Sequence, residues 1–365
     1  MSAATLLMLA AAAAAQSASA ANFDQIARDA AAARAANRSG DAIRLYRQAV
    51  DLRPNWAEGW WFIASLLYED DHYADAAPVF TRYVKLEPKS APGWTMLGLC
   101  EYQLGDYEMS LKHLALGKSL GLPESNQMAQ VARYHRGALY THFGQFDAAL
   151  DELKLFSFPP VESPKVIEAI GVAALRRPLL PQQVTAQDRE FILKTGRAVF
   201  DSWAARPAEA EREFKELLGS HPDNPHIHYL YGSYLLQSHS DAALGELTNC
   251  LELDPKYVPA MLQLAFEYLS RGEPAKGIPP AEDAVRLAPD SFVAHNALGR
   301  LLLENGNAAR AITELQAAVK LAPEVAECHF ALASAYMKAG RRQDGARENA
   351  EFLRLKKTRS EPAAQ

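Results

Sequence analysis

The sequence is poor in cysteine, and three thiols among 365 residues cannot form a disulfide framework. An excess of basic charge is also missing, because 38 Lys and Arg residues face 44 Asp and Glu residues, for a net charge of −6. Phosphate binding needs a basic footprint, so we expect no nucleic acid as partner. No stretch reaches the roughly 18 consecutive apolar residues of a membrane-spanning helix, and we therefore expect no stable membrane insertion of the mature chain.

Motifs of catalysis are missing as well. The sequence does not contain two histidines around a glutamate at helical spacing. Gly117-Lys118-Ser119 resembles the end of a phosphate-binding loop, but Lys112 stands where that loop requires glycine, so chance explains the match. We predict no catalytic residue and no cofactor, and hence that the protein is not an enzyme.

One histidine cluster occurs, at His221, His226 and His228. Imidazoles two residues apart can share a metal ion, but beyond Asp223 no further ligand stands at a convincing spacing. His295 and His329 are 34 residues apart and take the place of a tryptophan in earlier units. We therefore interpret these histidines as structural and predict no metal site.

The first 20 residues have the order of a secretory signal peptide. They contain no charged side chain, an apolar run from Leu6 to Ala15, and small residues at Ala18, Ser19 and Ala20. No Lys or Arg precedes the apolar run, which leaves an alanine-rich helix as the alternative. We expect cleavage after Ala20 and an exported protein, periplasmic or secreted.

Each cysteine lies in an apolar helical stretch. Cys100, Cys250 and Cys328 are an odd number of thiols, so in an oxidising compartment at least one stays unpaired. We predict that they are small buried hydrophobic residues.

A period of 34 residues organises the chain. Pro54 and Pro88 are 34 apart, and Pro255, Pro289 and Pro323 repeat the interval. Twelve residues before these prolines, and before Pro222, the residue is always small: Ala42, Ala76, Ala210, Ala243, Gly277 and Ala311. Eight residues before, it is mostly large and apolar: Tyr46, Phe80, Phe214, Leu247 and Leu315, with Ala281 as the weak member. Small residues at fixed places allow two helices to approach closely, and the proline ends the second helix.

The first half of each unit ends in glycine. Gly105, Gly144, Gly272, Gly306 and Gly340 each follow an amphipathic run. Glycine there adopts the left-handed conformation that closes a helix and starts a tight turn. Each unit is thus predicted to be a helix, a turn, a second helix and a proline.

This pattern resembles the tetratricopeptide repeat. The best matches are Trp94, Leu97 and Gly98 in one unit, and Leu298, Gly299, Ala311, Leu315, Ala318 and Pro323 in another. We count eight or nine units. The resemblance implies an all-α protein, a right-handed superhelical solenoid of antiparallel helix pairs with a long concave surface.

The period is interrupted once. We predict an array over residues 23–160, a degenerate repeat or connector over 161–186, a second array over 187–357 and a disordered tail at 358–365.

In proteins similar to this one, the first helix of each unit lines the concave surface and binds an extended peptide or a partner's helix. The corresponding positions are Trp61, Ser65, Tyr68, Thr95, Leu99, Tyr102, Tyr134, Phe266, Asn296, Arg300 and Phe330. The alternative is that these rings only pack between neighbouring units. Only Asn296 and Arg300 resemble the Lys, Asn and Arg set with which some relatives hold a terminal carboxylate, so such a clamp is not expected.

These observations favour a non-catalytic scaffold that binds a protein or peptide in its concave groove. A second hypothesis is a regulatory or assembly subunit of a cell-envelope machine acting on polysaccharide or outer-membrane proteins. A third, enzymatic hypothesis rests only on unrecognised residues in the 161–186 interruption.

Overall fold

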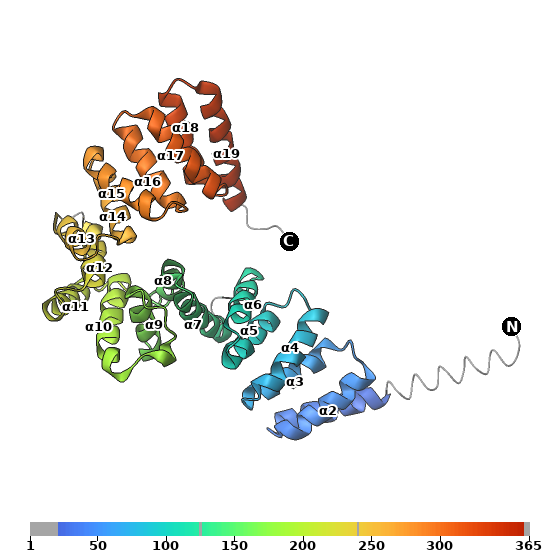
Figure 1. The fold of residues 1–365 in the computed structure, drawn as a ribbon. Helices are drawn as coiled ribbons and strands as arrows, with labels where there is room; N and C mark the ends of the chain where they lie inside the picture. The colour runs from blue at the N-terminus through green and yellow to red at the C-terminus, as the bar shows by residue number, and fades with distance from the viewer. Residues whose placement is uncertain (1–20, 124–125, 239–240, 361–365) are drawn as a thin grey trace, which may run out of the picture. The chain divides into compact units, whose positions relative to one another are not determined.

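The computed structural model describes residues 21–123, 126–238 and 241–360, which fold into helices without a β-strand (Figure 1). The predicted all-α class is confirmed. The chain divides into two compact units, one ending at Gly196 and the other beginning at Arg197. The predicted signal peptide lies outside the described residues. No helix in the described ranges is long and apolar enough to cross a membrane.

The first unit begins with a helix over residues 21–35. It continues with α2 (Ser39–Leu52), α3 (Ala57–Glu69), α4 (Tyr73–Leu86), α5 (Ala91–Leu104), α6 (Tyr107–Ser119), α7 (Gln127–His142), α8 (Phe146–Lys154), α9 (Pro164–Ala174) and the 3₁₀ turn η1 (Pro181–Gln183). Helix α10 (Ala186–Trp203) contains the boundary between the units. The pairs α3/α4, α5/α6 and α7/α8 pack as hairpins, and α5 also contacts α7.

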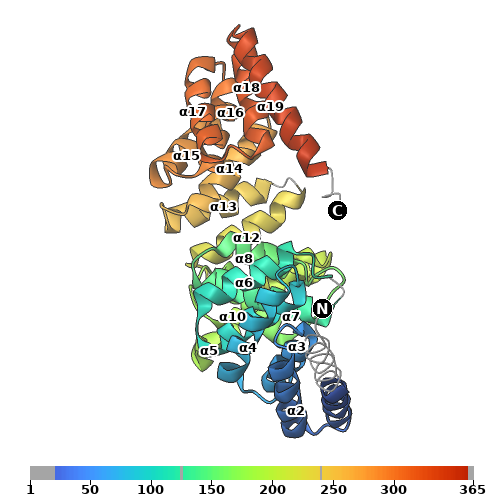
Figure 2. The ribbon, with the colours of Figure 1, turned by 90° about the vertical axis from the view of Figure 1, so that its right-hand side faces the viewer.

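The second unit comprises α11 (Pro207–Ser220), α12 (Pro225–Leu235), η2 (Leu236–Ser238), α13 (Asp241–Leu253), α14 (Val258–Ser270), α15 (Pro274–Leu287), α16 (Phe292–Glu304), α17 (Ala308–Leu321), α18 (Ala326–Lys338) and α19 (Arg342–Ser360). Each of the pairs α12/α13, α14/α15, α16/α17 and α18/α19 is a hairpin, and successive hairpins contact each other. Figure 2 shows the hairpins α14/α15, α16/α17 and α18/α19 stacked in chain order. The solenoid of helix pairs that the period predicts is therefore present.

The repeated prolines end helices as predicted. Helix α4 stops at Leu86, two residues before Pro88, and α17 stops at Leu321, two before Pro323. The helical conformation is disfavoured for the residue before a proline, which favours the end of a helix there. The predicted turn glycines are also confirmed, since Gly105, Gly144, Gly272, Gly306 and Gly340 all have positive φ.

Close packing within the hairpins explains the small residues. All of the repeated small and large apolar positions are buried. A Cβ added to Gly299 would lie 2.5 Å from Cγ of Leu315, which is closer than real side-chain contacts. Gly98 has the same relation to Leu114 in the first unit. Glycine on the first helix and leucine on the second thus set the short distance between the two helices.

The three cysteines are buried free thiols, as predicted. Burial raises the pKa of the Cys100 and Cys250 thiols to about 12 and that of Cys328 to about 11. Such thiols remain protonated at neutral pH and are poor nucleophiles.

One detail of the predicted organisation differs from the structure. Helix α19 runs to Ser360, so residues 358–360, predicted to begin a disordered tail, are helical, and the rest of the tail lies outside the described residues. The interruption at 161–186 holds α9, which packs against α10 at a very short distance. A Cβ on Gly196 would lie 1.9 Å from the carbonyl oxygen of Ile167.

Candidate partner-binding surface

Three of the predicted residues line one pocket in the first unit. Trp61, Ser65 and Tyr68 lie on one face of α3, because positions three and four apart in a helix point the same way. They border a pocket of about 750 Å³, here called the Trp61 pocket. Its other lining residues come from the preceding helices, from α3, from α5 and from α7: Arg34, Asn37, Ser39, Phe62, Leu66, Glu69, Met96, Gln127 and Met128.

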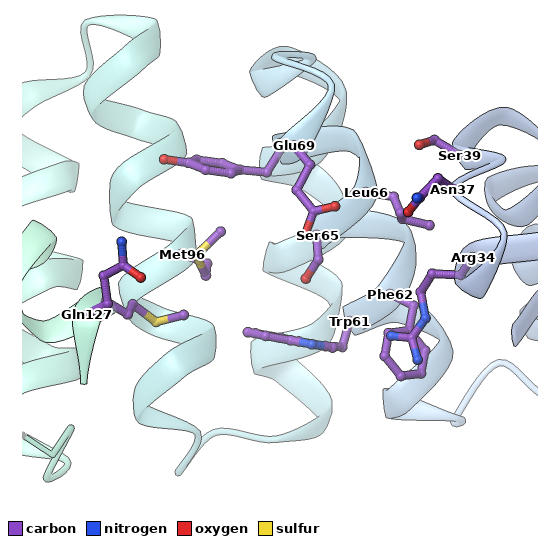
Figure 3. Close-up of a pocket in the computed structure, with 12 residues that line it drawn as sticks. Arg34, Asn37, Ser39, Trp61, Phe62, Ser65, Leu66, Glu69, Met96 and Gln127 are labelled. Carbon is purple, nitrogen blue, oxygen red and sulfur yellow. The ribbon is translucent and has the colours of Figure 1, made fainter. Parts of the chain in front are cut away.

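The Trp61 pocket combines rings with polar groups (Figure 3). The Trp61 ring extends from α3 toward α5, the helix that carries Met96. On the other side of α3, the guanidinium of Arg34 lies 3.6 Å from the centre of the Phe62 ring, a cation–π contact. The Ser65 hydroxyl is buried without a hydrogen-bond partner among the described residues. A ligand with a polar backbone could therefore gain both apolar contact and a hydrogen bond here.

Trp61 serves packing as well as the pocket. Its ring lies 5.7 Å from the Phe80 ring and 5.2 Å from the Tyr83 ring, measured between centres. The side chain is half-buried and also borders a smaller cavity of about 480 Å³ near Tyr83. The two interpretations of this residue, packing and binding, are thus both compatible with its position.

Two residues of the predicted set are not available to a partner. Thr95 is fully buried, and its hydroxyl donates a hydrogen bond of 2.9 Å to the carbonyl oxygen of Ala91. Gly117 of α6 packs directly against this hydroxyl. Leu99 is 3% exposed and belongs to the hydrophobic core of the first unit. The prediction was wrong for both, because α5 is covered by several helices and has a narrower free face than the repeat pattern suggests.

Tyr102 and Tyr134 line a second pocket of about 690 Å³, here called the Tyr102 pocket. The ring of His135 lies 4.2 Å from that of Tyr102, measured between centres. Burial lowers the pKa of His135 to about 4, so the imidazole is neutral at pH 7. Burial also raises the pKa of both tyrosines.

The interruption contributes to the Tyr102 pocket, which the sequence interpretation missed. Its residues Pro164, Lys165, Glu168, Pro181 and Gln182 line the pocket, and so does Arg189 of α10. The hydroxyl of Tyr102 donates a hydrogen bond of 3.2 Å to the Oε1 atom of Gln182. No sequence signal marks this contact, because the two residues are 80 positions apart.

In the second unit, Asn296, Arg300 and Phe330 line a pocket of about 310 Å³ between α16 and α18, here called the Asn296 pocket. The Oδ1 atom of Asn296 is buried and lacks a hydrogen-bond partner within the described ranges. Phe330 is 54% exposed. Phe266 does not line this pocket; it is half-buried against the core formed by α14 to α18. The Asn296 pocket is thus smaller than the Trp61 pocket.

The recurring rings at one repeat position have a structural role. Trp60 and Trp94 donate hydrogen bonds of 2.9 Å to the carbonyl oxygens of Pro54 and Pro88. At the same position the Nε2 atoms of His228, His295 and His329 donate to the carbonyl oxygens of Pro222, Pro289 and Pro323 over 2.7, 2.9 and 3.0 Å. Their Nδ1 atoms contact the carboxylates of Glu246, Glu314 and Glu348. The structural interpretation of His295 and His329 is therefore confirmed.

The remaining motifs have local explanations. His226 contacts the Tyr257 hydroxyl at 3.0 Å and His221 the Ser220 hydroxyl at 2.9 Å, so the histidine cluster is divided among separate partners. Across the described part of the chain, no three His, Cys, Asp or Glu residues form a group that could hold a metal ion. Gly117-Lys118-Ser119 lies in the last turns of α6, where Lys118 pairs with Glu152.

A comparison with family models agrees with the fold. The model of the tetratricopeptide repeat matches residues 28–91, 63–116, 204–244, 262–326 and 296–360, which together are more than half of the chain. Among solved structures, "MamA 41-end from Desulfovibrio magneticus RS-1" is 22% identical, with 46% of this chain and 96% of that chain covered and a TM-score of 0.43. "MamA RS-1 ArsTM double mutant" is 21% identical, with 47% and 96% covered and a TM-score of 0.43. No curated protein matches the chain.

Proposed function

This chain belongs to the tetratricopeptide repeat family, and we propose that it is a non-catalytic scaffold that binds an extended peptide or a partner's helix through the first helices of its units. The observation that carries the proposal is the Trp61 pocket. Three side chains that the repeat pattern predicts on the concave surface, Trp61, Ser65 and Tyr68, border a cavity of about 750 Å³. Recesses of this size lined by aromatic side chains are typical anchor sites of protein partners.

The chemistry of the Trp61 pocket favours a peptide over a flat protein surface. Its walls are apolar at Trp61, Leu66 and Met96, and polar at Asn37 and Gln127. Amide side chains can hydrogen-bond both the N–H and the C=O groups of an incoming backbone, and the rings can receive apolar side chains. One acidic residue, Glu69, and one basic residue, Arg34, leave the pocket without a strong charge preference.

The experiment is affinity capture with the purified mature chain and with its Trp61→Ala variant. We expect the variant to lose the captured partner by roughly tenfold or more in affinity, because truncation of a central aromatic anchor costs about 2 kcal/mol or more. Circular dichroism of both chains measures helical content. A partner retained by the folded variant would contradict the proposal, and so would a loss of helicity, since Trp61 would then be a core residue.

Phe143 provides the matched control. It is an aromatic residue at the C-terminal end of α7, 37% exposed, and it lines neither the Trp61 pocket nor the Tyr102 pocket. Phe143→Ala is expected to capture the same partner as the original chain. Loss of the partner in both variants would show that the binding does not depend on the Trp61 pocket.

Export remains part of the proposal and rests on the order of residues 1–20. Sequencing of the mature amino terminus tests it, with Ala21 as the expected first residue. Export favours the second candidate function, a subunit of a cell-envelope machine that acts on polysaccharide or outer-membrane proteins. Capture of a glycan synthase or of an assembly complex would support that function; capture of unrelated peptides only would contradict it.

A further inference from the structure

Residues 176–185, which connect α9 to α10, reach back to α5. Leu180 is 1% exposed and belongs to the same hydrophobic core as Tyr102 of α5 and Ala138 of α7. Next to it, Gln182 accepts the hydrogen bond from the Tyr102 hydroxyl. The connection from α9 to α10 does not by itself require a contact with α5. We therefore attribute this contact to the surface of α5 and α7 on which the loop packs.

The connector has the conformation of a bound peptide. Leu180 is extended, with φ −79° and ψ 151°, and Val184 is extended as well. Between them lies a single 3₁₀ turn, in which the Leu180 amide donates a hydrogen bond of 2.7 Å to the Gln183 side chain. Arg177 pairs with Asp188 over 3.1 Å, and Arg189 pairs with Glu168 over 3.1 Å. The segment is thus anchored near both of its ends while its centre lies on the pocket wall.

The receiving surface is not filled by the connector. About 690 Å³ remain open beside Pro181 and Gln182. The Nδ1 atom of His135 is buried there without a hydrogen-bond partner among the described residues. An unsatisfied buried polar atom costs free energy, which a hydrogen-bonding group of a ligand would recover. The pocket therefore offers both apolar room and an unused polar atom.

We propose that residues 178–183 cover part of the α5 and α7 surface as an internal ligand and so form one wall of the Tyr102 pocket, and that the partner segment this surface accepts has the same chemistry. That segment is an extended, uncharged peptide in which a leucine enters the apolar core, a proline follows, and a side-chain carbonyl oxygen accepts the Tyr102 hydrogen bond. The inference rests on the proposed function and specifies its ligand for the Tyr102 pocket. A tethered segment is present at a high effective concentration, so it outcompetes a free peptide of equal intrinsic affinity.

The test uses the full chain in two forms, the original and one in which residues 178–183 are replaced by a Gly-Ser sequence of equal length. The probe is a fluorescein-labelled peptide with the sequence of residues 176–185, followed by fluorescence anisotropy. We expect the replaced chain to bind the probe at least roughly tenfold more tightly than the original chain, because the tethered competitor is gone.

Two further peptides serve as controls. A probe carrying Leu180→Asp should not bind the replaced chain, since an aspartate would have to enter the apolar core, and a probe carrying Gln182→Ala should bind more weakly. Equal binding of the probe to both chains, or no binding to a replaced chain that retains its helical content, would overturn the proposal.

A second measurement covers the case in which the replaced chain does not fold. Tyr102→Phe removes only the hydroxyl that donates to Gln182. Hydrogen exchange of the Leu180 and Gln183 amides should then accelerate several-fold while exchange in α5 and α7 stays unchanged. Unchanged exchange at both amides would overturn the proposal.

The outcome is separable from that of the proposed function. Partner capture that depends on Trp61 tests binding at the Trp61 pocket, whereas binding of the labelled peptide tests the Tyr102 pocket. A chain that captures a partner through Trp61 but fails both tests here would retain the scaffold function and lose only the internal ligand.

Discussion

The imidazole of His295 donates a hydrogen bond of 2.9 Å to the carbonyl oxygen of Pro289. Trp94 makes the bond of the same length to Pro88 with its indole N–H. In both cases the ring lies six residues after the proline that ends the preceding helix. The bond ties the start of one unit to the end of the unit before it, and two chemically different rings satisfy the same geometric need.

The first prediction concerns this bond. His295→Ala should lower the free energy of unfolding of the second unit by roughly 1–3 kcal/mol, because it removes the bond to Pro289 and leaves Glu314 without its ring partner. His295→Trp should cost less than His295→Ala, because the indole can still donate to Pro289. Denaturant unfolding followed by circular dichroism measures both. An equal loss of stability in the two variants would show that the hydrogen bond to the carbonyl oxygen of Pro289 contributes little.

The second prediction concerns a buried ion pair in the first unit. Glu152 accepts hydrogen bonds from Arg136 over 2.8 Å and from Lys118 over 2.6 Å. Burial raises the pKa of Glu152, but the hydrogen bonds from Arg136 and Lys118 outweigh this and hold it below its usual range. Its stabilisation is therefore present above the unfolded pKa and is lost as the pH falls through the folded pKa.

Glu152→Gln should destabilise the first unit by about 3–5 kcal/mol, because it leaves the Arg136 guanidinium buried and uncompensated. Lys118→Gln is the matched control, since the side chain of Lys118 is 46% exposed against 4% for Arg136. Lys118→Gln should lower the free energy of unfolding by less than about 1 kcal/mol. Thermal unfolding at pH 7 measures both variants, and a similar cost for the two would contradict the importance of burial.

The third prediction concerns the pH dependence of the second unit. Burial, followed by the charge of Asp201, raises the pKa of Glu213 to about 7 from a reference of 4.5. As the pH rises from 4.5 to 7, the unfolded chain loses this proton while the folded chain keeps it. The contribution of Glu213 to the free energy of unfolding is therefore fully present below pH 4.5 and is lost as the pH rises through 7.

Glu213→Gln should raise the unfolding midpoint at pH 8 and leave it nearly unchanged at pH 4.5. Glu216→Gln, at an exposed position in the same helix, provides the control and should have little effect at either pH. Calorimetry at pH 4.5 and at pH 8 measures the unfolding midpoints of both variants. A midpoint shift of equal size at both would mean that Glu213 acts through packing rather than through its charge.

The fourth prediction concerns the close approach of α9 and α10. Gly196→Ala should destabilise the first unit by several kcal/mol, because its new Cβ would collide with the carbonyl oxygen of Ile167, which cannot move without displacing the backbone. Gly40→Ala in α2 meets nothing within 4 Å and should stabilise by a few tenths of a kcal/mol to about 1 kcal/mol. Urea unfolding measures the stability of both variants. A Gly196→Ala variant as stable as the original chain would contradict the close packing of α9 against α10.

Much of the architecture could be predicted from the sequence. The helix ends at Leu86 and Leu321 and the left-handed turn at Gly105 follow from signals within a few residues of each site, and the 34-residue period repeats those signals many times. The free thiols were also predictable, because Cys100 sits inside an apolar run. Features of this kind depend on residues that are close together in the sequence, and they can therefore be predicted from it.

The candidate surface could be predicted only in part. Trp61 and Ser65 do line a pocket, but Thr95 and Leu99, which stand 34 residues later at the equivalent repeat positions, are buried. Which face of a first helix stays open depends on the helices that pack beside it. The repeat pattern treats all units as equal and therefore cannot distinguish an open unit from a covered one.

By itself the sequence determined the helix hairpins, their turns and their close packing, because each of these depends on residues that are neighbours along the chain. Only the tertiary structure decided which inner side chains remain accessible, and that Gln182 meets Tyr102 across 80 positions. Both outcomes depend on contacts between distant segments, whose partners no local pattern specifies.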